Sequence, residues 1–315
     1  AAVAADLCHV SLGSDTGGSI RQPASFCGVI GVKPTYGRVS RYGLIAYASS
    51  FDQIGPFAKS MDDAALVTEV ISGADEFDAT CSSKPVEVYS SVSELEGKKR
   101  FAYLKQTIEM DGLNPEVKAG FMAKVDQLKA DGHEVSAVDF PYLDQLVPTY
   151  YVLTTAEASS NLSRFDGMRY GYRSDKAHDL ESTYKLSRTE GFGTEVKRRI
   201  MLGTFVLSAG YYDAYYSKGQ KVRRLVSDKV DEIFEENDFI ISPTTPDVAF
   251  KFGANTDDPI KMYLEDIYTV MSNLAGIPAI SFPIGSNSEG LPFSMQVMAP
   301  KFKESEAFAA SISLA

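Results

Sequence analysis

The chain has 315 residues, which is long enough to bury a large hydrophobic core in one large domain or two ordinary ones. Its 44% hydrophobic and 23% charged residues are typical of a soluble globular protein, and its formal charge of −11 argues against unaided binding to nucleic acid or to an anionic membrane. No hydrophobic run is long enough to span a bilayer, so no membrane partner is expected.

The first third of the chain predicts an early helix, a loop-rich region and a second helix. Residues 1–5 are interpreted as the interior of a buried helix. Residues 26–56 are rich in Gly, Ser and Tyr and predict loops with short strands. Ser60 is a candidate N-cap for a helix that carries its hydrophobic face over residues 64–71 and is closed by Gly73. The polar residues 74–98 are expected to lie at the surface.

A strand, a helix and a second strand are predicted next along the chain. The strands cover residues 100–104 and 134–140, and the helix begins at Asn114 and Pro115 and ends at Gly132. Four hydrophobic residues repeat at helical spacing on one face of this helix: Val117, Phe121, Val125 and Leu128. Because a crossover helix joins strands that run in the same direction, this segment predicts a parallel pair in an α/β sheet.

The second half of the chain predicts helices first and strands afterwards. Residues 148–216 are expected to form helices and long loops rich in tyrosine, and a long helix is expected over residues 211–237. The remaining predicted elements are three strands and a final helix, at residues 238–242, 279–285, 291–297 and 302–314. We therefore predict a single α/β domain over residues 1–315, with a large mixed, mostly parallel sheet covered by helices on both faces.

Cysteine and histidine give no sign of a metal site. The three cysteines have no metal-ligand spacing and suggest reduced thiols in a cytoplasmic protein: Cys8, Cys27 and Cys81. The three histidines fit no zinc motif and give little support to a Ser-His-Asp triad: His9, His133 and His178. No bound metal is expected.

Two adjacent glycines stand directly before a serine, at Gly17, Gly18 and Ser19. Glycine can enter backbone conformations that other residues avoid, and successive amide N–H groups in such a turn can converge on a negative charge. A serine there could attack a carbonyl carbon while the amides hold the resulting oxyanion. The alternative is an ordinary surface loop, which Gly-, Ser- and Thr-rich sequences usually form.

Three stretches of the sequence resemble the amidase signature family. They are GSDTGGSIRQPA at residues 13–24, GVKPTYGRVS at residues 31–40 and DQIGP at residues 52–56. The resemblance implies the fold of that family, with Ser19 as the nucleophile of an acyl transfer. It also implies an oxyanion hole formed by the amide groups of Thr16, Gly17, Gly18 and Ser19.

The catalytic unit of the resembled family is Ser-cisSer-Lys, and the resemblance places the bridging serine and the lysine upstream of Ala1. We therefore expect this chain to lack the N-terminal part of its domain and to be inactive by itself. Lys33 could replace the missing base if burial lowered its pKa, but a structural role is favoured for this lysine. Asp15 and Arg21 flank the loop with opposite charges and are expected to hold its shape from behind.

Two further segments, residues 156–167 and 205–216, resemble one branch of the family, the A subunits of glutamyl-tRNA(Gln)/aspartyl-tRNA(Asn) amidotransferases. An enzyme that hydrolyses free glutamine needs a cation for the α-carboxylate and a carboxylate for the α-ammonium group. The resemblance assigns these roles to Arg199 and Asp266, and it assigns a contact with polar groups of the substrate to Tyr150. The neighbouring positions are the alternatives for each role: Tyr151, Arg198 and Glu265.

The same branch implies the substrate and the partners. Glutamine would be hydrolysed by this chain, and the ammonia would convert Glu-tRNA(Gln) to Gln-tRNA(Gln), Asp-tRNA(Asn) to Asn-tRNA(Asn), or both. A B subunit would use ATP and Mg²⁺ and carry most of the tRNA contact, a small C subunit would join the two, and this chain would bind no cofactor. Two alternatives stay open, which are a stand-alone amidase for another small amide and a non-catalytic fragment.

Overall fold

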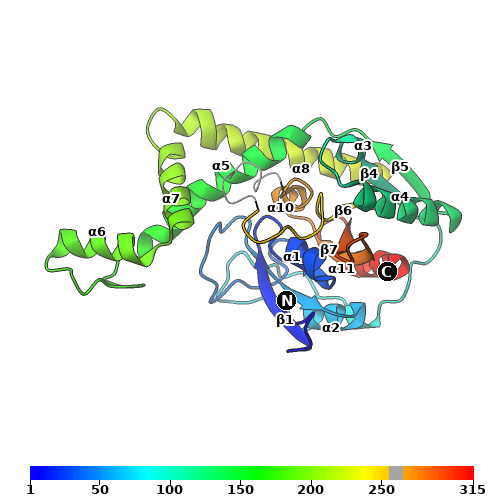
Figure 1. The fold of residues 1–315 in the computed structure, drawn as a ribbon, viewed down its shortest axis with the longest axis horizontal. Helices are drawn as coiled ribbons and strands as arrows, with labels where there is room; N and C mark the ends of the chain where they lie inside the picture. The colour runs from blue at the N-terminus through cyan, green and yellow to red at the C-terminus, as the bar shows by residue number, and fades with distance from the viewer. Residues whose placement is uncertain (255–264) are drawn as a thin grey trace. The chain divides into compact units, whose positions relative to one another are not determined.

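The structure is a computed structural model that describes residues 1–254 and 265–315. In these residues eight strands form one sheet, in the spatial order β1-β3-β2-β7-β8-β6-β4-β5 (Figure 1). The strands are β1 (Val10–Asp15), β2 (Ile30–Lys33), β3 (Gln53–Ala58), β4 (Arg100–Leu104), β5 (Glu134–Val138), β6 (Phe239–Pro243), β7 (Ala279–Ser286) and β8 (Pro292–Met298). The sheet thus combines segments from both ends of the chain.

The sheet is mixed, and most of its described strand pairs are antiparallel. β4 runs parallel to its neighbours β5 and β6, while the other five pairs are antiparallel. The predicted parallel pair is confirmed, with Phe101 opposite Val135. The prediction of a mixed α/β sheet is confirmed as well, but the prediction that it is mostly parallel is wrong. Parallel neighbours need a long crossover, and a short turn joins β7 to β8 instead.

The described helices include most of those predicted. They are α1 (Arg21–Cys27), α2 (Met61–Ile71), α3 (Lys105–Glu109), α4 (Pro115–Ala130), α5 (Leu143–Asn161), α6 (Leu180–Gly191), α7 (Thr194–Val206), α8 (Lys218–Glu236), α10 (Val270–Ala275) and α11 (Glu304–Leu314), with short 3₁₀ turns η1 (Tyr89–Ser91) and η2 (Leu162–Arg164). Ser60 caps α2 as predicted, because its side chain accepts the N–H of Asp63 at 3.1 Å. The long helix predicted over residues 211–237 is interrupted, since a π-helical segment, η3 (Asp213–Ser217), precedes α8.

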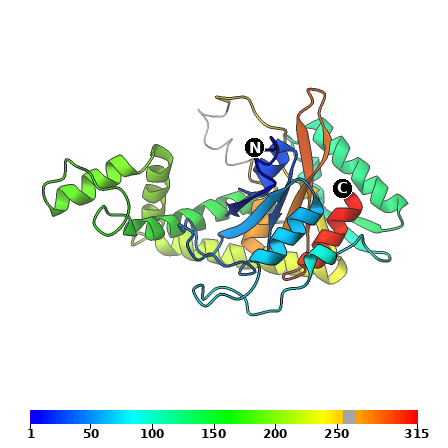
Figure 2. The same cartoon turned by 90° about the horizontal axis from the view of Figure 1, so that it is seen from below.

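Helices lie on both faces of the sheet, as predicted. In β8, Gln296 accepts a hydrogen bond from Arg21 of α1, whereas the ring of Phe293 lies against Gly120 of α4. Positions 293 and 296 are an odd number of residues apart, so their side chains point to opposite faces. α2 and α11 lie side by side against the sheet in both views (Figures 1 and 2).

The burial of side chains confirms the predicted helix α4 and contradicts the predicted helix at residues 1–5. The hydrophobic face predicted for α4 is buried, since its four residues are at most 2% exposed: Val117, Phe121, Val125 and Leu128. Residues 1–5 do not form a buried helix. They form turns in which Val3 is buried while Ala1, Ala2 and Ala5 are exposed. Starting a helix is unfavourable without packing to support it, and alanine methyl groups offer little surface to pack.

The chain divides into two compact units. The sheet lies entirely in unit 1, whereas α6 and α7 lie in unit 2. Unit 1 comprises Ala1–Gly43, Gln53–Val147 and Arg224–Ala315, and unit 2 comprises Leu44–Asp52 and Pro148–Arg223. The prediction of a single domain over residues 1–315 stays a prediction.

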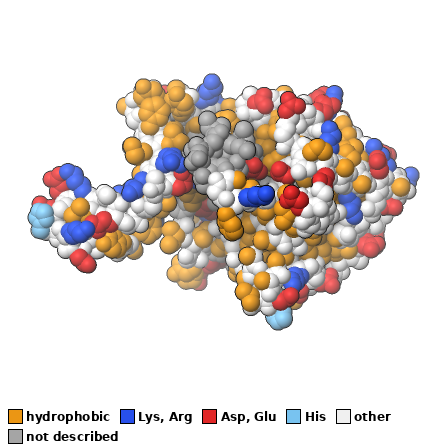
Figure 3. Space-filling model, in the orientation of Figure 1, with side chains coloured by type: hydrophobic (Ala, Val, Ile, Leu, Met, Phe, Trp, Pro, Cys, Tyr) orange, Lys and Arg blue, Asp and Glu red, His pale blue; other side chains and the backbone are white. Residues whose placement is uncertain are grey.

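Charges of both signs are interspersed on the surface. Figure 3 shows basic and acidic side chains alternating across the visible face rather than gathering by sign. In the part of the chain that the structure describes, no helix is both long and hydrophobic enough to cross a membrane.

Candidate active site

The predicted nucleophile, Ser19, is exposed in the turn between β1 and α1. Gly18, directly before it, has a φ of +135°, which favours glycine. A Cβ atom at Gly18 would also lie 2.3 Å from Oγ1 of Thr269. The turn that presents Ser19 therefore requires glycine at position 18 for two independent reasons.

A buried carboxylate holds the backbone on both sides of Ser19. Asp15, the last residue of β1, is fully buried. Its Oδ1 accepts the N–H of Gly18 at 2.8 Å, and its Oδ2 accepts the N–H of Ile20 at 3.3 Å. Side chains of aspartate commonly accept such nearby backbone N–H groups. Asp15 thus fixes the two neighbours of Ser19 and leaves the serine side chain exposed.

The same hydrogen bond affects the predicted oxyanion hole. Because the N–H of Gly18 donates to Asp15, one of the four predicted donors is already occupied. Within the described residues, the N–H groups of Gly17 and Ser19 make no hydrogen bond. Among the predicted oxyanion-hole donors, the amides of Gly17 and Ser19 therefore stay available for hydrogen bonding within the described residues.

Arg21 completes a buried charge network behind the loop. Its Nε and Nη2 donate to the two carboxylate oxygens of Asp15, at 3.1 and 3.2 Å. Its remaining contacts are with the carbonyl of Thr269 and the side chains of Gln296 and Asn273, at 3.0, 2.9 and 2.7 Å. Burial by itself would raise the pKa of Asp15, but the charge and hydrogen bonds of Arg21 outweigh it and hold that pKa below its ordinary value. The oppositely charged pair expected from the sequence therefore exists.

Thr269 links the loop that carries Ser19 to the predicted ammonium-binding residue. Its hydroxyl lies 2.6 Å from the carbonyl oxygen of Gly17 and 3.1 Å from that of Asp266. Asp266 itself is half-buried, in the turn before α10. The loop that carries Ser19 and the backbone of Asp266 therefore lie close together in unit 1. The motif that pointed to Asp266 begins at residues 263 and 264, which lie outside the described residues.

Replacing Thr269 with valine is expected to lower the free energy of unfolding by about 1–2 kcal/mol, because the buried carbonyl of Gly17 loses its hydrogen bond. Valine keeps the shape that lies against Gly18. Thr269→Ser is the matched control, since it keeps the hydroxyl and loses only a methyl group. Urea denaturation of the three proteins measures the effect, and equal stability of the valine and serine variants would contradict it.

The contacts of Lys33 support a structural role rather than that of a base. It is buried in β2, and its Nζ donates to the carbonyl oxygens of Pro34 and Ile277 at 3.0 and 2.5 Å. Burial, together with the nearby charge of Arg21, lowers the pKa of Lys33 to about 7. A lysine that served as a base would need its lone pair directed at the nucleophile, so the two carbonyl partners support the structural interpretation.

Arg199, the predicted carboxylate-binding residue, lies on α7 in unit 2. Its Nε donates to Glu195 at 2.8 Å and its Nη1 to the hydroxyl of Tyr47 at 2.9 Å. Its guanidinium also lies over the rings of Tyr47 and Tyr151, at 5.4 and 5.6 Å. Burial alone would lower the pKa of Arg199, but Tyr47 and Glu195 raise it above its ordinary value. The guanidinium therefore carries a permanent positive charge in a partly desolvated position.

Tyr150, the third predicted substrate residue, is buried in α5. Its ring packs against Phe51 and Tyr151, with centroid distances of 5.9 and 5.0 Å. Tyr151 is the ring that lies beside Arg199. The structure therefore places Tyr150 one ring away from that guanidinium.

Sequence reasoning missed several residues that shape these sites. They are Tyr47, Glu195, Thr269, Asn273 and Gln296. Apart from Glu195, which stands four residues before Arg199, each reaches its partner from a distant segment. Only the helical spacing of Glu195 and Arg199 gave a local signal in the sequence.

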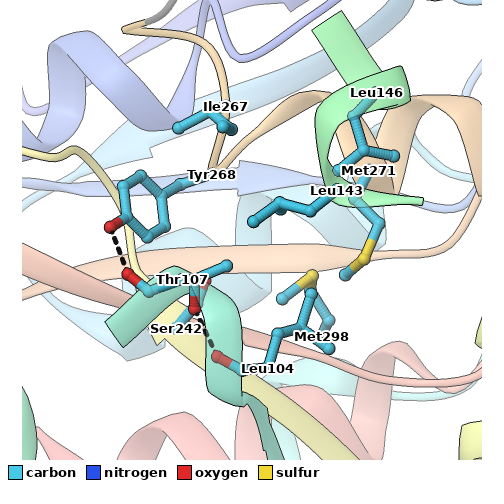
Figure 4. Close-up of a pocket in the computed structure, with 9 residues that line it drawn as sticks. All are labelled: Leu104, Thr107, Leu143, Leu146, Ser242, Ile267, Tyr268, Met271 and Met298. Atoms are coloured by element: carbon cyan, nitrogen blue, oxygen red, sulfur yellow. Dashed lines mark hydrogen bonds between the residues drawn. The ribbon is translucent and has the colours of Figure 1, made fainter. Parts of the chain in front are cut away.

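A small cavity lies inside unit 1, near the turn that contains Asp266. Its volume is about 10 Å³, which is the space of a single water molecule. Its lining is mostly hydrophobic (Figure 4): Leu104, Thr107, Leu143, Leu146, Ser242, Ile267, Tyr268, Met271 and Met298. The hydroxyl of Tyr268 donates to the carbonyl of Thr107 at 2.6 Å and closes one side. The cavity is too small for an amino acid and is a gap in the packing.

The polar groups of the candidate site are those of amide chemistry. In unit 1, the hydroxyl of Ser19 and the backbone amides beside it suit acyl transfer from an amide. In unit 2, the guanidinium of Arg199 suits recognition of a carboxylate. Across residues 1–254 and 265–315, no group of three or more His, Cys, Asp or Glu side chains is placed to hold a metal ion.

Comparisons with known proteins agree with this chemistry. The Amidase family model matches residues 1–308. The A subunit of glutamyl-tRNA(Gln) amidotransferase from Koribacter versatilis is 55% identical over 305 residues, which are 96% of this chain and 63% of that protein. The chain therefore spans about 63% of the length of this curated relative.

Solved structures show the same fold. The crystal structure of the A subunit of glutamyl-tRNA(Gln) amidotransferase from Thermotoga maritima matches with a TM-score of 0.80 and 42% identity, over 100% of this chain and 63% of that one. The peptide amidase from Stenotrophomonas maltophilia matches with a TM-score of 0.76 and 28% identity, over 99% of this chain and 63% of that one. Since the family model covers nearly the whole chain and the structures share its fold, this protein belongs to the Amidase family, the amidase signature enzymes.

Proposed function

We propose that this chain is part of the glutamine-hydrolysing subunit of a tRNA-dependent amidotransferase, and that Ser19 is its nucleophile. The observation that carries the proposal is the exposed Ser19 after a Gly-Gly turn, with both of its neighbours held by the buried Asp15. The 55% identity to the A subunit of an amidotransferase supports this branch of the family.

The proposed reaction is an acyl transfer. Oγ of Ser19 forms a bond to the side-chain amide carbon of glutamine, the C–N bond breaks, and the nitrogen leaves as ammonia. Water then cleaves the acyl-serine ester, which releases glutamate and restores the hydroxyl. We propose that the amide groups of Gly17 and Ser19, and that of Thr16 beside them, stabilise the oxyanion. The amide of Gly18 already donates to Asp15.

The reaction also needs a base that accepts the proton of Ser19. The resemblance implies that a cis-serine and a lysine remove the proton of the nucleophilic serine. Neither of these two residues matches a position in residues 1–315. We therefore expect residues 1–315 alone not to hydrolyse glutamine. We also propose that residues 1–315 belong to a single amidase domain and form a large part of it.

Substrate recognition is assigned to three side chains. Arg199 binds the α-carboxylate of glutamine, Asp266 binds the α-ammonium group, and Tyr150 contacts polar groups of the substrate. The raised pKa of Arg199 supports its role in binding a carboxylate, because the guanidinium stays charged at every physiological pH. Asp266 lies close to the nucleophile loop through Thr269.

The relatives are named as the A subunit of an amidotransferase, which supports a place for this chain in a multi-subunit enzyme. We propose a B subunit that uses ATP and Mg²⁺ to activate misacylated Glu-tRNA(Gln) or Asp-tRNA(Asn) and makes most of the tRNA contact, with a small C subunit between them. This chain then needs no cofactor of its own. The reduced cysteines expected from the sequence favour a cytoplasmic complex.

A stand-alone amidase is the second candidate, because the solved peptide amidase shares the fold. Arg199→Ala and Asp266→Ala in the full-length protein distinguish the two functions. Each change removes a charge-assisted contact, so the KM for glutamine is expected to rise about tenfold or more. Steady-state glutaminase kinetics measure it, with Arg198→Ala as the control. If both variants keep the wild-type KM, free glutamine is not the substrate and the amidase alternative is favoured.

A further inference from the structure

We propose that Tyr47 is a positioning residue for Arg199, and that it acts with Glu195 to direct the remaining N–H groups of the guanidinium at the substrate carboxylate. The inference rests on the proposed role of Arg199 in binding glutamine. Tyr47 comes from Leu44–Asp52, the short segment that joins unit 2 from the first part of the chain.

The segment that carries Tyr47 is itself held in place. Asp52 accepts the backbone N–H groups of Tyr47 and Ala48, at 2.9 and 3.0 Å. The side-chain amide of Asn161, on α5, donates to the carbonyl of Tyr47 at 3.2 Å. The backbone of Tyr47 is therefore fixed from two directions, so its hydroxyl has a defined position relative to α7.

The hydrogen bonds of Arg199 within the described residues leave three N–H groups of its guanidinium unoccupied. A guanidinium has five N–H donors, and here Glu195 takes the one on Nε while Tyr47 takes one on Nη1. The second N–H of Nη1 and both on Nη2 bind no other group among residues 1–254 and 265–315. These N–H groups, both of them on Nη2 among them, can donate to the oxygens of a carboxylate.

Glu195 alone would not set this direction. Glu195 stands one helical turn before Arg199, and its side chain is 44% exposed. Its second carboxylate oxygen accepts a hydrogen bond from Arg198 instead. Exposed ion pairs along one helix contribute little and leave long side chains mobile. Tyr47 adds a contact from a different segment, with its hydroxyl on Nη1 and its ring over the guanidinium. This contact also distinguishes Arg199 from Arg198, which forms its ion pair with Glu195.

Tyr47→Phe in the full-length protein tests the inference, because it removes the hydroxyl and keeps the ring. The expected result is a KM for glutamine about tenfold higher, with kcat within about twofold of wild type. A glutamine analogue with a carboxamide in place of the α-carboxylate should give the same KM for both proteins. Tyr172→Phe is the matched control, because it removes another tyrosine hydroxyl that bonds a charged group of unit 2, Glu190.

A second pair of variants tests the positioning through Glu195. Glu195→Gln keeps an oxygen for Nε and is expected to change the KM less than twofold. Glu195→Ala frees Nε, and the KM should rise about threefold or more. Equal KM values for these two variants would overturn the role of Glu195, whether or not Tyr47→Phe folds.

The outcomes separate this inference from the proposed function. If Arg199→Ala raises the KM while Tyr47→Phe matches wild type, the positioning role of Tyr47 is wrong and the proposed function stands. If Arg199→Ala leaves the KM unchanged, the proposed function itself fails. If Tyr47→Phe raises the KM for the carboxamide analogue equally, the hydroxyl acts on something other than carboxylate binding, which also overturns the inference.

Discussion

Ser19→Ala in the full-length protein is expected to lower the rate of glutamine hydrolysis by about 10⁴-fold or more, because loss of a nucleophile removes the covalent route altogether. Ser19 is exposed, so its replacement should leave the fold intact. Its neighbours are held by Asp15 through backbone N–H groups that alanine does not disturb. Release of glutamate from glutamine measures the effect, with Ser91→Ala, an exposed serine of η1, as the control.

Hydroxylamine provides a second readout of the same prediction. A glutamyl-serine ester formed at Ser19 would be captured by hydroxylamine as a γ-glutamyl hydroxamate, in place of attack by water. Wild-type protein should therefore form the hydroxamate and Ser19→Ala should not. Full hydroxamate formation by the alanine variant would show that another residue is the nucleophile and that the assignment of Ser19 is wrong.

The fold was most predictable where local patterns and packing agree. The helix α4 has a cap, a proline in its first turn and a hydrophobic face, and each of these corresponds to a feature of the structure. The short elements α1 and β1 were not predicted, because α1 has seven residues and its neighbours are a Gly-rich turn. Strand direction was predicted wrongly for most pairs, since pairing across the sheet depends on contacts that no local pattern encodes.

The candidate site was predictable to the extent that motifs are contiguous. Ser19, Asp15 and Arg21 stand within seven positions, and the structure joins the last two directly. Thr269 reaches the same loop from 252 residues away, and Tyr47 stands 152 residues from Arg199. Threonine and tyrosine are common in structural positions, so residue type alone could not have marked either of them.

Asp15→Asn is expected to lower the free energy of unfolding by about 3–5 kcal/mol at pH 7, because it leaves the fully buried Arg21 without its opposite charge. Arg21 keeps only neutral partners in the variant, and neutral oxygens cannot replace the carboxylate. Urea denaturation at neutral pH measures the loss. The double variant Asp15→Asn/Arg21→Leu removes both buried charges together. Its loss of unfolding free energy should therefore be smaller than the sum of the losses in the two single variants.

The stabilisation by Asp15 is expected to depend on pH. The pKa of Asp15 is lower in the folded protein than its ordinary value of about 4, so folding favours the ionised carboxylate. The stability that the carboxylate contributes is therefore complete above pH ~4 and is lost as the pH falls through the lower folded pKa. The difference in stability between wild type and Asp15→Asn should therefore shrink as the pH falls below ~4. A difference that grows in acid would contradict the stabilising role of the Asp15–Arg21 pair.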